Sequence, residues 1–189
     1  MTNPKVELRG YLRKLMHRFR FITQMDDELS IILTWLGRPD GINAIEEGAS
    51  FFNLVQRSFN QNLLIELCKF IDDDEEKSLR DYLSKAKECA EPLEPVRFNI
   101  DEMRREVVSR NEFENIINEH IRDLENHNRV ISNLKARRDK ALAHTDTSFF
   151  NNPKRHYETY PLMVEDISHL LETLKKYLKN IGAIYLNQI

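Results

Sequence analysis

The sequence predicts an all-α protein, a bundle of about four long helices with additional short ones. Apolar residues recur at spacings of three and four over long stretches, as on the buried face of a helix. Five glycines and six prolines in 189 residues are too few for the many turns of a β-sandwich or barrel. No stretch alternates apolar and polar residues as a half-buried strand does. The length fits a single domain over residues 1–189.

The first helix is expected over residues 4–36. Asn3 followed by Pro4 is typical of a helix start, because proline is favoured at the first helical position. The helical apolar pattern then continues until the glycines and proline of residues 37–41 interrupt it. The stretch is predicted to be one helix or a kinked pair.

The second helix is predicted to begin at Asn43, because Glu46 three residues later completes a capping-box pattern. It should end at the acidic run 72–76, because carboxylates are unfavourable at a helix C-terminus. We expect this run to be a solvated loop, with a contact between Asp72 and a basic segment further along the chain as the alternative.

A short third helix is predicted over residues 79–89. Ser78 and Asp81 form its N-terminal cap, and Pro92 lies beyond its end. The helix should therefore be brief.

The next helical stretch is predicted to begin at Asn99, with a second start at Ser109, and to reach His144. Periodicity is absent from residues 145–160, which are predicted to be a loop. Pro161 is expected to open the last helix, whose leucine and isoleucine stripe is regular.

Aromatic residues fall into two groups. The first lies at helical spacings and is expected in the core: Trp35, Phe51, Phe52, Phe59 and Phe70. The second lies in or beside the predicted loop, where packing over the end of the bundle and stacking on nucleic-acid bases are the alternatives: Phe149, Phe150, Tyr157 and Tyr160.

Composition limits the functional classes. The net charge of −3 argues against a general nucleic-acid coat, although a local basic patch remains compatible with it. Cys68 and Cys89 lack the spacing and companion histidines of a zinc site. No signal peptide and no apolar run long enough to span a membrane is visible, so we expect a cytoplasmic protein without cofactor or metal. The histidines outside residue 144 are expected to be surface or hydrogen-bonded groups.

One segment, residues 135–144, suggests chemistry. Its sequence is Lys-Ala-Arg-Arg-Asp-Lys-Ala-Leu-Ala-His, with four cations and one acid. Arginine offers a planar fork of donors to phosphate oxygens, and histidine is suited to proton transfer near neutral pH. The segment can therefore bind a phosphate and move a proton.

The spacing within this segment restricts how the side chains can cooperate. Arg138 and His144 are six residues apart, about 120° around a straight helix, whereas Arg137 and His144 share a face. Arg138 reaches His144 if the helix ends nearby, or if a second copy completes the site across a two-fold axis.

Arginine, a polar residue and a histidine a few residues later, at the end of a long helix, resemble the HEPN superfamily. The fuller phrase over residues 138–146 is most similar to the AbiU-type branch, which is associated with phage abortive infection. The stretches 67–72 and 78–80 also resemble the second helix of that branch and its following turn. The resemblance implies a HEPN-like helical fold over most of the chain.

The resemblance implies a metal-independent endoribonuclease that acts as a toxin or antiphage effector. In that scheme a ribose 2′-hydroxyl attacks the adjacent phosphate and leaves a 2′,3′-cyclic end. His144 would be the general acid or base, and Arg138 would stabilise the transition state. Asp139 would orient Arg138 or His144, and Lys140 would hold the flanking backbone.

The implied partners are an RNA substrate, a second copy of the chain in a homodimer, and an antitoxin. For Lys135 and Arg137 the alternatives are contact with RNA and an ordinary solvated face. Arg137 also competes with Arg138 as the motif arginine, and Arg138 is preferred because Asp139 follows it. The rival functions are a non-catalytic HEPN-like module that binds RNA or protein, and a helical interaction protein whose motif is accidental.

Overall fold

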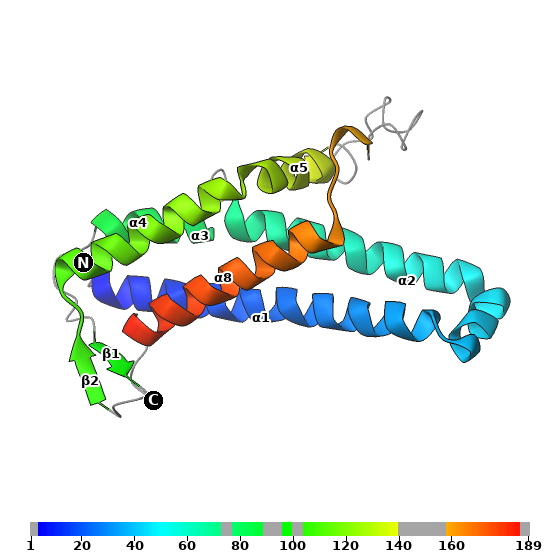
Figure 1. The fold of residues 1–189 in the computed structure, drawn as a ribbon, viewed down its shortest axis with the longest axis horizontal. Coiled ribbons are helices and arrows are strands. Elements are labelled where there is room, and N and C mark those ends of the chain that lie inside the picture. Colours follow the sequence, from blue (N-terminus) through cyan, green and yellow to red (C-terminus); the bar gives the residue numbers. More distant parts are fainter. Residues whose placement is uncertain (1–3, 73–76, 89–95, 100–103, 140–157, 186–189) are drawn as a thin grey trace.

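The computed structural model describes residues 4–72, 77–88, 96–99, 104–139 and 158–185, and confirms an all-α fold (Figure 1). Two long helices, α1 (Pro4–Leu36) and α2 (Pro39–Ile71), lie side by side along the longest axis. The helices α3 (Leu79–Glu88), α4 (Arg110–Asn126), α5 (Asn128–Arg138) and α8 (Val164–Tyr185) pack around the half of this pair that holds the start of α1.

Helix α1 has the bounds that its sequence predicts. Its buried side chains are spaced by three or four residues, so they form one stripe that faces α2, α3 and α8. These residues are Leu8, Leu12, Leu15, Phe19, Ile22, Met25 and Leu29. The opposite face of α1 is left to solvent.

Helix α2 begins at Pro39, so the predicted start at Asn43 is wrong. Proline at the first helical position overrides the capping-box pattern, and the helix continues through a kink at Gly48. The turn before α2 is tight enough to require Gly41, because a Cβ there would collide with the carbonyl oxygen of Trp35. The predicted end is confirmed, since Asp72 is the C-terminal cap residue.

Two predicted helix caps are confirmed. The backbone N–H of Asp81 donates to Ser78 Oγ at 3.2 Å at the start of α3. The N–H of Glu112 donates to Ser109 Oγ at 3.2 Å at the start of α4. Local capping chemistry therefore decides where these helices begin.

The helix start predicted at Asn99 is wrong. Asn99 ends strand β1 (Val96–Asn99), which pairs antiparallel with β2 (Arg104–Val107). Val96 is opposite Val107 and Asn99 is opposite Arg104. Strand β1 also contacts α8, so the ribbon depends on tertiary contacts as well as on its own pairing.

Two further boundaries differ from the prediction. The helical stretch predicted to run from Ser109 to His144 breaks at His127, which separates α4 from α5. Helix α8 begins at Val164, three residues after Pro161, and Asp166 Oδ2 accepts a hydrogen bond from the N–H of Met163 at 3.2 Å. The carboxylate thus satisfies a donor at the helix start.

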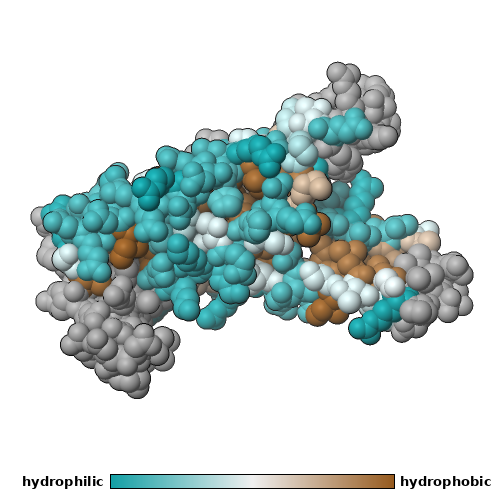
Figure 2. Space-filling model, viewed as in Figure 1, coloured by the Kyte–Doolittle hydropathy of each residue, from teal (hydrophilic) through white to brown (hydrophobic). Residues whose placement is uncertain are grey.

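The C-terminal end of α1 and the N-terminal part of α2 carry exposed apolar side chains. Hydrophobic residues gather on the surface toward the end of the bundle where α1 meets α2, whereas hydrophilic residues dominate over α4 and α8 (Figure 2). Phe51 is 63 % exposed, so its predicted core position is wrong, whereas Phe70 is fully buried as predicted. Within the described part of the chain, no helix is long and apolar enough to cross a membrane.

Candidate functional site

The predicted basic segment meets a buried carboxylate at the junction of α2 and α5. Arg138 Nη1 donates to Asp72 Oδ2 at 2.9 Å, and Lys135 Nζ forms an ion pair with Asp72 Oδ1. The side chain of Asp72 is only 1 % exposed. The contact between Asp72 and the basic segment, which the sequence left as an alternative to a solvated loop, is therefore present.

Local structure explains why these three side chains converge. Asp72 caps the C-terminus of α2, where its N–H donates to the Cys68 carbonyl at 2.8 Å. A carboxylate is unfavourable at this negative end of the helix dipole unless a cation compensates it. Lys135 and Arg138 are three residues apart on the last turn of α5, so they face Asp72 together.

A second carboxylate fixes the orientation of Arg138. Arg138 Nε donates to Asp139 Oδ1 at 2.8 Å, while the Arg138 side chain remains 19 % exposed. Burial opposes the charge, but the hydrogen bonds to Asp139 and Asp72 outweigh it and raise the pKa of Arg138 above its ordinary value. The site therefore holds a permanently charged guanidinium with part of its surface open to solvent.

The thiol of Cys68 lies against this cluster. Burial raises the pKa of Cys68 to about 12, with Arg138 lowering it and Asp72 raising it by smaller amounts. The thiol is therefore protonated at physiological pH. Its role is packing, because a protonated buried thiol is a poor nucleophile.

Arg137 points to a different partner. Its Nε donates to the carbonyl oxygen of Tyr160 at 2.7 Å, which ties α5 to the segment before α8. Asn133 Nδ2 donates to the Pro161 carbonyl at 2.8 Å and strengthens the same connection. The two adjacent arginines thus serve two different junctions of the fold.

The structure brings together four of the residues singled out in the sequence, namely Asp72, Lys135, Arg138 and Asp139. His144 and Lys140 lie outside the described residues, as do Phe149, Phe150 and Tyr157 of the predicted loop. Tyr160 is described and half-buried. The geometry between Arg138 and His144 therefore remains a prediction.

His120 departs from the expectation of a surface or hydrogen-bonded histidine. It is 1 % exposed, its ring centroid is 4.1 Å from that of Tyr177, and neither ring nitrogen has a hydrogen-bond partner among the described residues. Burial lowers the pKa of His120 to about 4. The imidazole is therefore neutral at physiological pH and unsuited to general acid catalysis there.

Among the residues that the structure describes, no group of three or more His, Cys, Asp or Glu side chains is arranged to hold a metal ion. The chemistry that the described site offers is that of a fixed, charged guanidinium beside a lysine that shares its carboxylate partner. Such a pair can bind and polarise a phosphate.

Comparison with known proteins places these residues in a family. The family model described as AbiU2, of the HEPN type, matches residues 14–188 and so covers both Asp72 and residues 135–144. No curated protein and no solved structure gives a significant match to the chain. The protein belongs to the AbiU2 family of HEPN domains, which is associated with abortive infection.

Proposed function

We propose that the protein is an endoribonuclease of a toxin or antiphage system, which cleaves RNA with Arg138 and His144 and without a metal. The observation that carries the proposal is the guanidinium of Arg138, which Asp72 and Asp139 hold at the end of α5. Family membership adds support, because the matched range of residues 14–188 includes both Arg138 and His144.

In the proposed reaction the ribose 2′-oxygen attacks the adjacent phosphorus as its proton passes to the His144 imidazole. The bond between phosphorus and the 5′-oxygen of the next nucleotide breaks, and that oxygen receives a proton from the imidazolium of a histidine. The products are a 2′,3′-cyclic phosphate and a free 5′-hydroxyl. Arg138 stabilises the extra negative charge on the phosphorane-like transition state, where a fixed cation acts most strongly.

Asp72 is a positioning residue in this scheme. Its carboxylate contacts both Arg138 and Lys135, so it limits the conformations of two long side chains before substrate binds. Asp139 restricts the guanidinium from a second direction. The arginine side chain therefore loses its conformational entropy during folding, so less entropy is lost when RNA binds.

We infer that two copies of the chain complete the site. Arg138 is the last residue of α5 and its side chain is partly exposed, so a second copy that packs against this helix end can approach its guanidinium. A two-fold axis near the end of α5 would place each arginine near the histidine of the partner subunit and join two basic segments.

The decisive experiment compares wild type with Arg138→Ala and His144→Ala in the presence of a chelator. We expect both variants to lose cleavage and growth arrest on expression, and wild-type products to carry 2′,3′-cyclic phosphate ends. Arg137→Ala is the matched control, because Arg137 contacts a backbone carbonyl and not Asp72. Unchanged cleavage by both variants would contradict the proposal.

A non-catalytic RNA-binding module is the second candidate. It is favoured by basic surface elsewhere on the chain, on the first half of α1. Salt-sensitive RNA binding by wild type without any cleavage product would support this candidate over the first.

A further inference from the structure

The two halves of α1 differ sharply in charge. Residues 4–20 contain six Lys or Arg residues and one acid, whereas residues 21–36 contain three acids and no Lys or Arg. The first half therefore carries a formal charge of +5 in a chain whose net charge is −3. This imbalance is larger than that of residues 120–144, where six cations face three acids.

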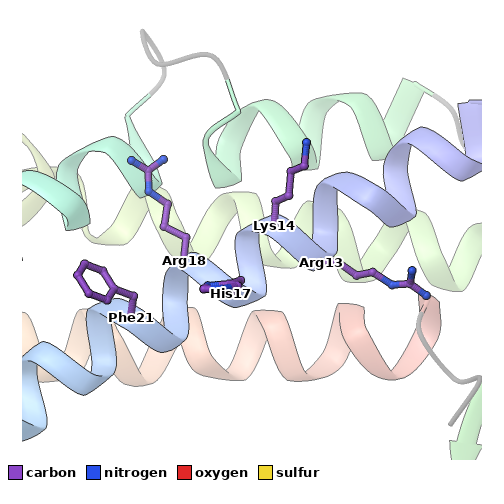
Figure 3. A pocket seen from close by; sticks show the side chains of 5 residues that line it. All are labelled: Arg13, Lys14, His17, Arg18 and Phe21. Atoms are coloured by element: carbon purple, nitrogen blue, oxygen red, sulfur yellow. The ribbon is translucent and has the colours of Figure 1, made fainter.

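The described cations of the first half, from Arg9 to Arg20, lie away from the buried stripe of α1. An open groove of about 510 Å³ lies along this side and is lined by Arg13, Lys14, His17, Arg18 and Phe21 (Figure 3). The figure shows these side chains spread along the outer side of one helix, with α8 behind it. The spacing of one, four, five and eight residues places them on one face, opposite the buried stripe.

Most of these cations have no internal partner. The side chains of Arg9, Arg13, Lys14, His17 and Arg20 are exposed and make no hydrogen bond or ion pair with any residue that the structure describes. Arg18 differs, because its Nε forms an ion pair with Glu66 Oε2 at 3.1 Å. The remaining positive charge is therefore available to a ligand.

We propose that this outer face of α1 binds single-stranded RNA through its phosphodiester backbone, as an anchoring surface distinct from the Arg138 site. The choice of RNA rests on the proposed function, whereas the preference for a phosphate polymer rests on the surface itself. The positions Arg9, Arg13, His17 and Arg20 place a donor about every 6 Å along the helix, in a row suited to successive phosphates.

An aromatic side chain lies beside these cations, as on surfaces that bind single-stranded nucleic acid. Phe21 is 51 % exposed and lies at one end of the groove, where a base can stack on its ring. Gly10 leaves open space on the same side of the helix, with no atom within 4 Å of where its Cβ would be. The regular apolar stripe of α1, from Leu8 to Leu29, is buried in the bundle, so this stripe is not available for insertion into a membrane.

The test measures binding of a labelled single-stranded RNA by fluorescence anisotropy in a His144→Ala background, which separates binding from cleavage. The variant Arg13→Gln/Lys14→Gln/Arg20→Gln should bind on the order of tenfold more weakly. The slope of log K against log salt should fall by about 2, because each lost phosphate contact in a single strand removes about 0.7.

The matched control is Lys175→Gln/Lys176→Gln/Lys179→Gln on α8, which removes the same charge from exposed lysines. This control should keep its affinity within about threefold and its salt slope within about 0.5 of the wild-type value. An equal loss in both variants would overturn the proposal, because the net charge alone would then explain binding. Thermal melting of each variant verifies that the bundle is folded.

Three further readouts separate the alternatives. DNA of the same sequence should bind with similar affinity if the backbone is the ligand, and this outcome supports the proposal. Binding to anionic phospholipid vesicles but not to RNA would overturn it. If wild type binds RNA through α1 yet never cleaves it, the anchoring surface stands and the proposed nuclease function fails.

Discussion

The positive charges at the end of α5 have a buried carboxylate partner, whereas most of those on the first half of α1 have no partner among the described residues. Lys135 and Arg138 contact a carboxylate that is 1 % exposed, and Arg138 has a second carboxylate beside it. Arg13 and Lys14 on α1 project into solvent with no partner among the described residues. Positive charge therefore has two different uses in one small bundle.

The two arrangements of positive charge suit different chemical tasks. A guanidinium fixed before substrate arrives suits a reaction, because a preorganised charge stabilises a transition state most effectively. Mobile exposed cations suit attraction of a polymer whose phosphates vary in position, and such attraction is weakened by salt.

The carboxylate of Asp72 should be the most costly charged group to remove. Asp72→Ala leaves two partly buried cations without their shared partner, so we expect the free energy of unfolding to fall by about 3 kcal/mol. The melting temperature should then drop by roughly 6–12 °C for a chain of this size. RNA cleavage should be lost as well.

Glu66 provides the matched control for Asp72. It also contacts two cations, Arg18 and Lys69, each at 3.1 Å, but its side chain is 23 % exposed. Glu66→Ala should cost less than about 1 kcal/mol, since solvent screens the exposed pairs. If both variants lower the free energy of unfolding equally, burial of the carboxylate does not determine how much its ion pairs stabilise the fold.

His120 differs from the cations of α1 and α5, because burial keeps its side chain uncharged at physiological pH. Its pKa is about 4 in the folded protein because of burial, against 6.5 for the unperturbed side chain, so the unfolded chain binds the proton more readily. The associated stability is present above pH 6.5 and is lost as the pH falls toward 4. By pH 5 the loss should be on the order of 2 kcal/mol.

Urea unfolding of wild type and His120→Phe between pH 7.5 and pH 4.5 measures this dependence. The variant should lack the part of the pH dependence that His120 contributes, while the ring keeps its packing against Tyr177. An identical pH dependence in both proteins would show that His120 is not the group responsible.

Arg137 should have a smaller effect, because its hydrogen bond to the Tyr160 carbonyl is made to an uncharged backbone group. Arg137→Gln removes the bond from its Nε to the Tyr160 carbonyl and should cost about 1 kcal/mol, or roughly 2–4 °C in melting temperature. Arg122→Gln is the control, since Arg122 is exposed on α4. If both variants melt at the same temperature, the hydrogen bond between Arg137 and the Tyr160 carbonyl contributes little to stability.

The cations of α1 should contribute least to folding. Arg13→Gln/Lys14→Gln/Arg20→Gln should change the free energy of unfolding by no more than about 0.5 kcal/mol per site, because exposed substitutions without partners have small effects. Differential scanning calorimetry checks this against wild type. A large drop in melting temperature would mean that α1 uses these charges internally.

Local signals predicted much of the helical frame. The proline at the start of α1 and the serines that cap α3 and α4 act within one helical turn, so the sequence around them is sufficient. The start of α2 was mispredicted because two local signals competed and Pro39 prevailed over Asn43. The β1–β2 ribbon was missed because its contacts with α8 join residues far apart in the sequence.

The site was predictable only in part, for a similar reason. The segment 135–144 is visible as a local cluster of cations, but its contact with Asp72 joins residues 66 apart in the chain. The sequence pointed toward this contact only as the alternative to a solvated loop over residues 72–76. The positive charge of α1 is visible in the sequence as an imbalance over residues 4–20. That these cations lie on one side of the helix becomes clear only once the buried stripe is known.

The long separation between Asp72 and Arg138 has a consequence during synthesis and folding. Two segments that distant meet only after the intervening chain has closed into a loop, a step that comes late because of its entropic cost. A ribosome-bound fragment that ends before α5 contains the carboxylate but not its arginine. The ordered guanidinium therefore forms only when the bundle has assembled, and partly made chains lack it.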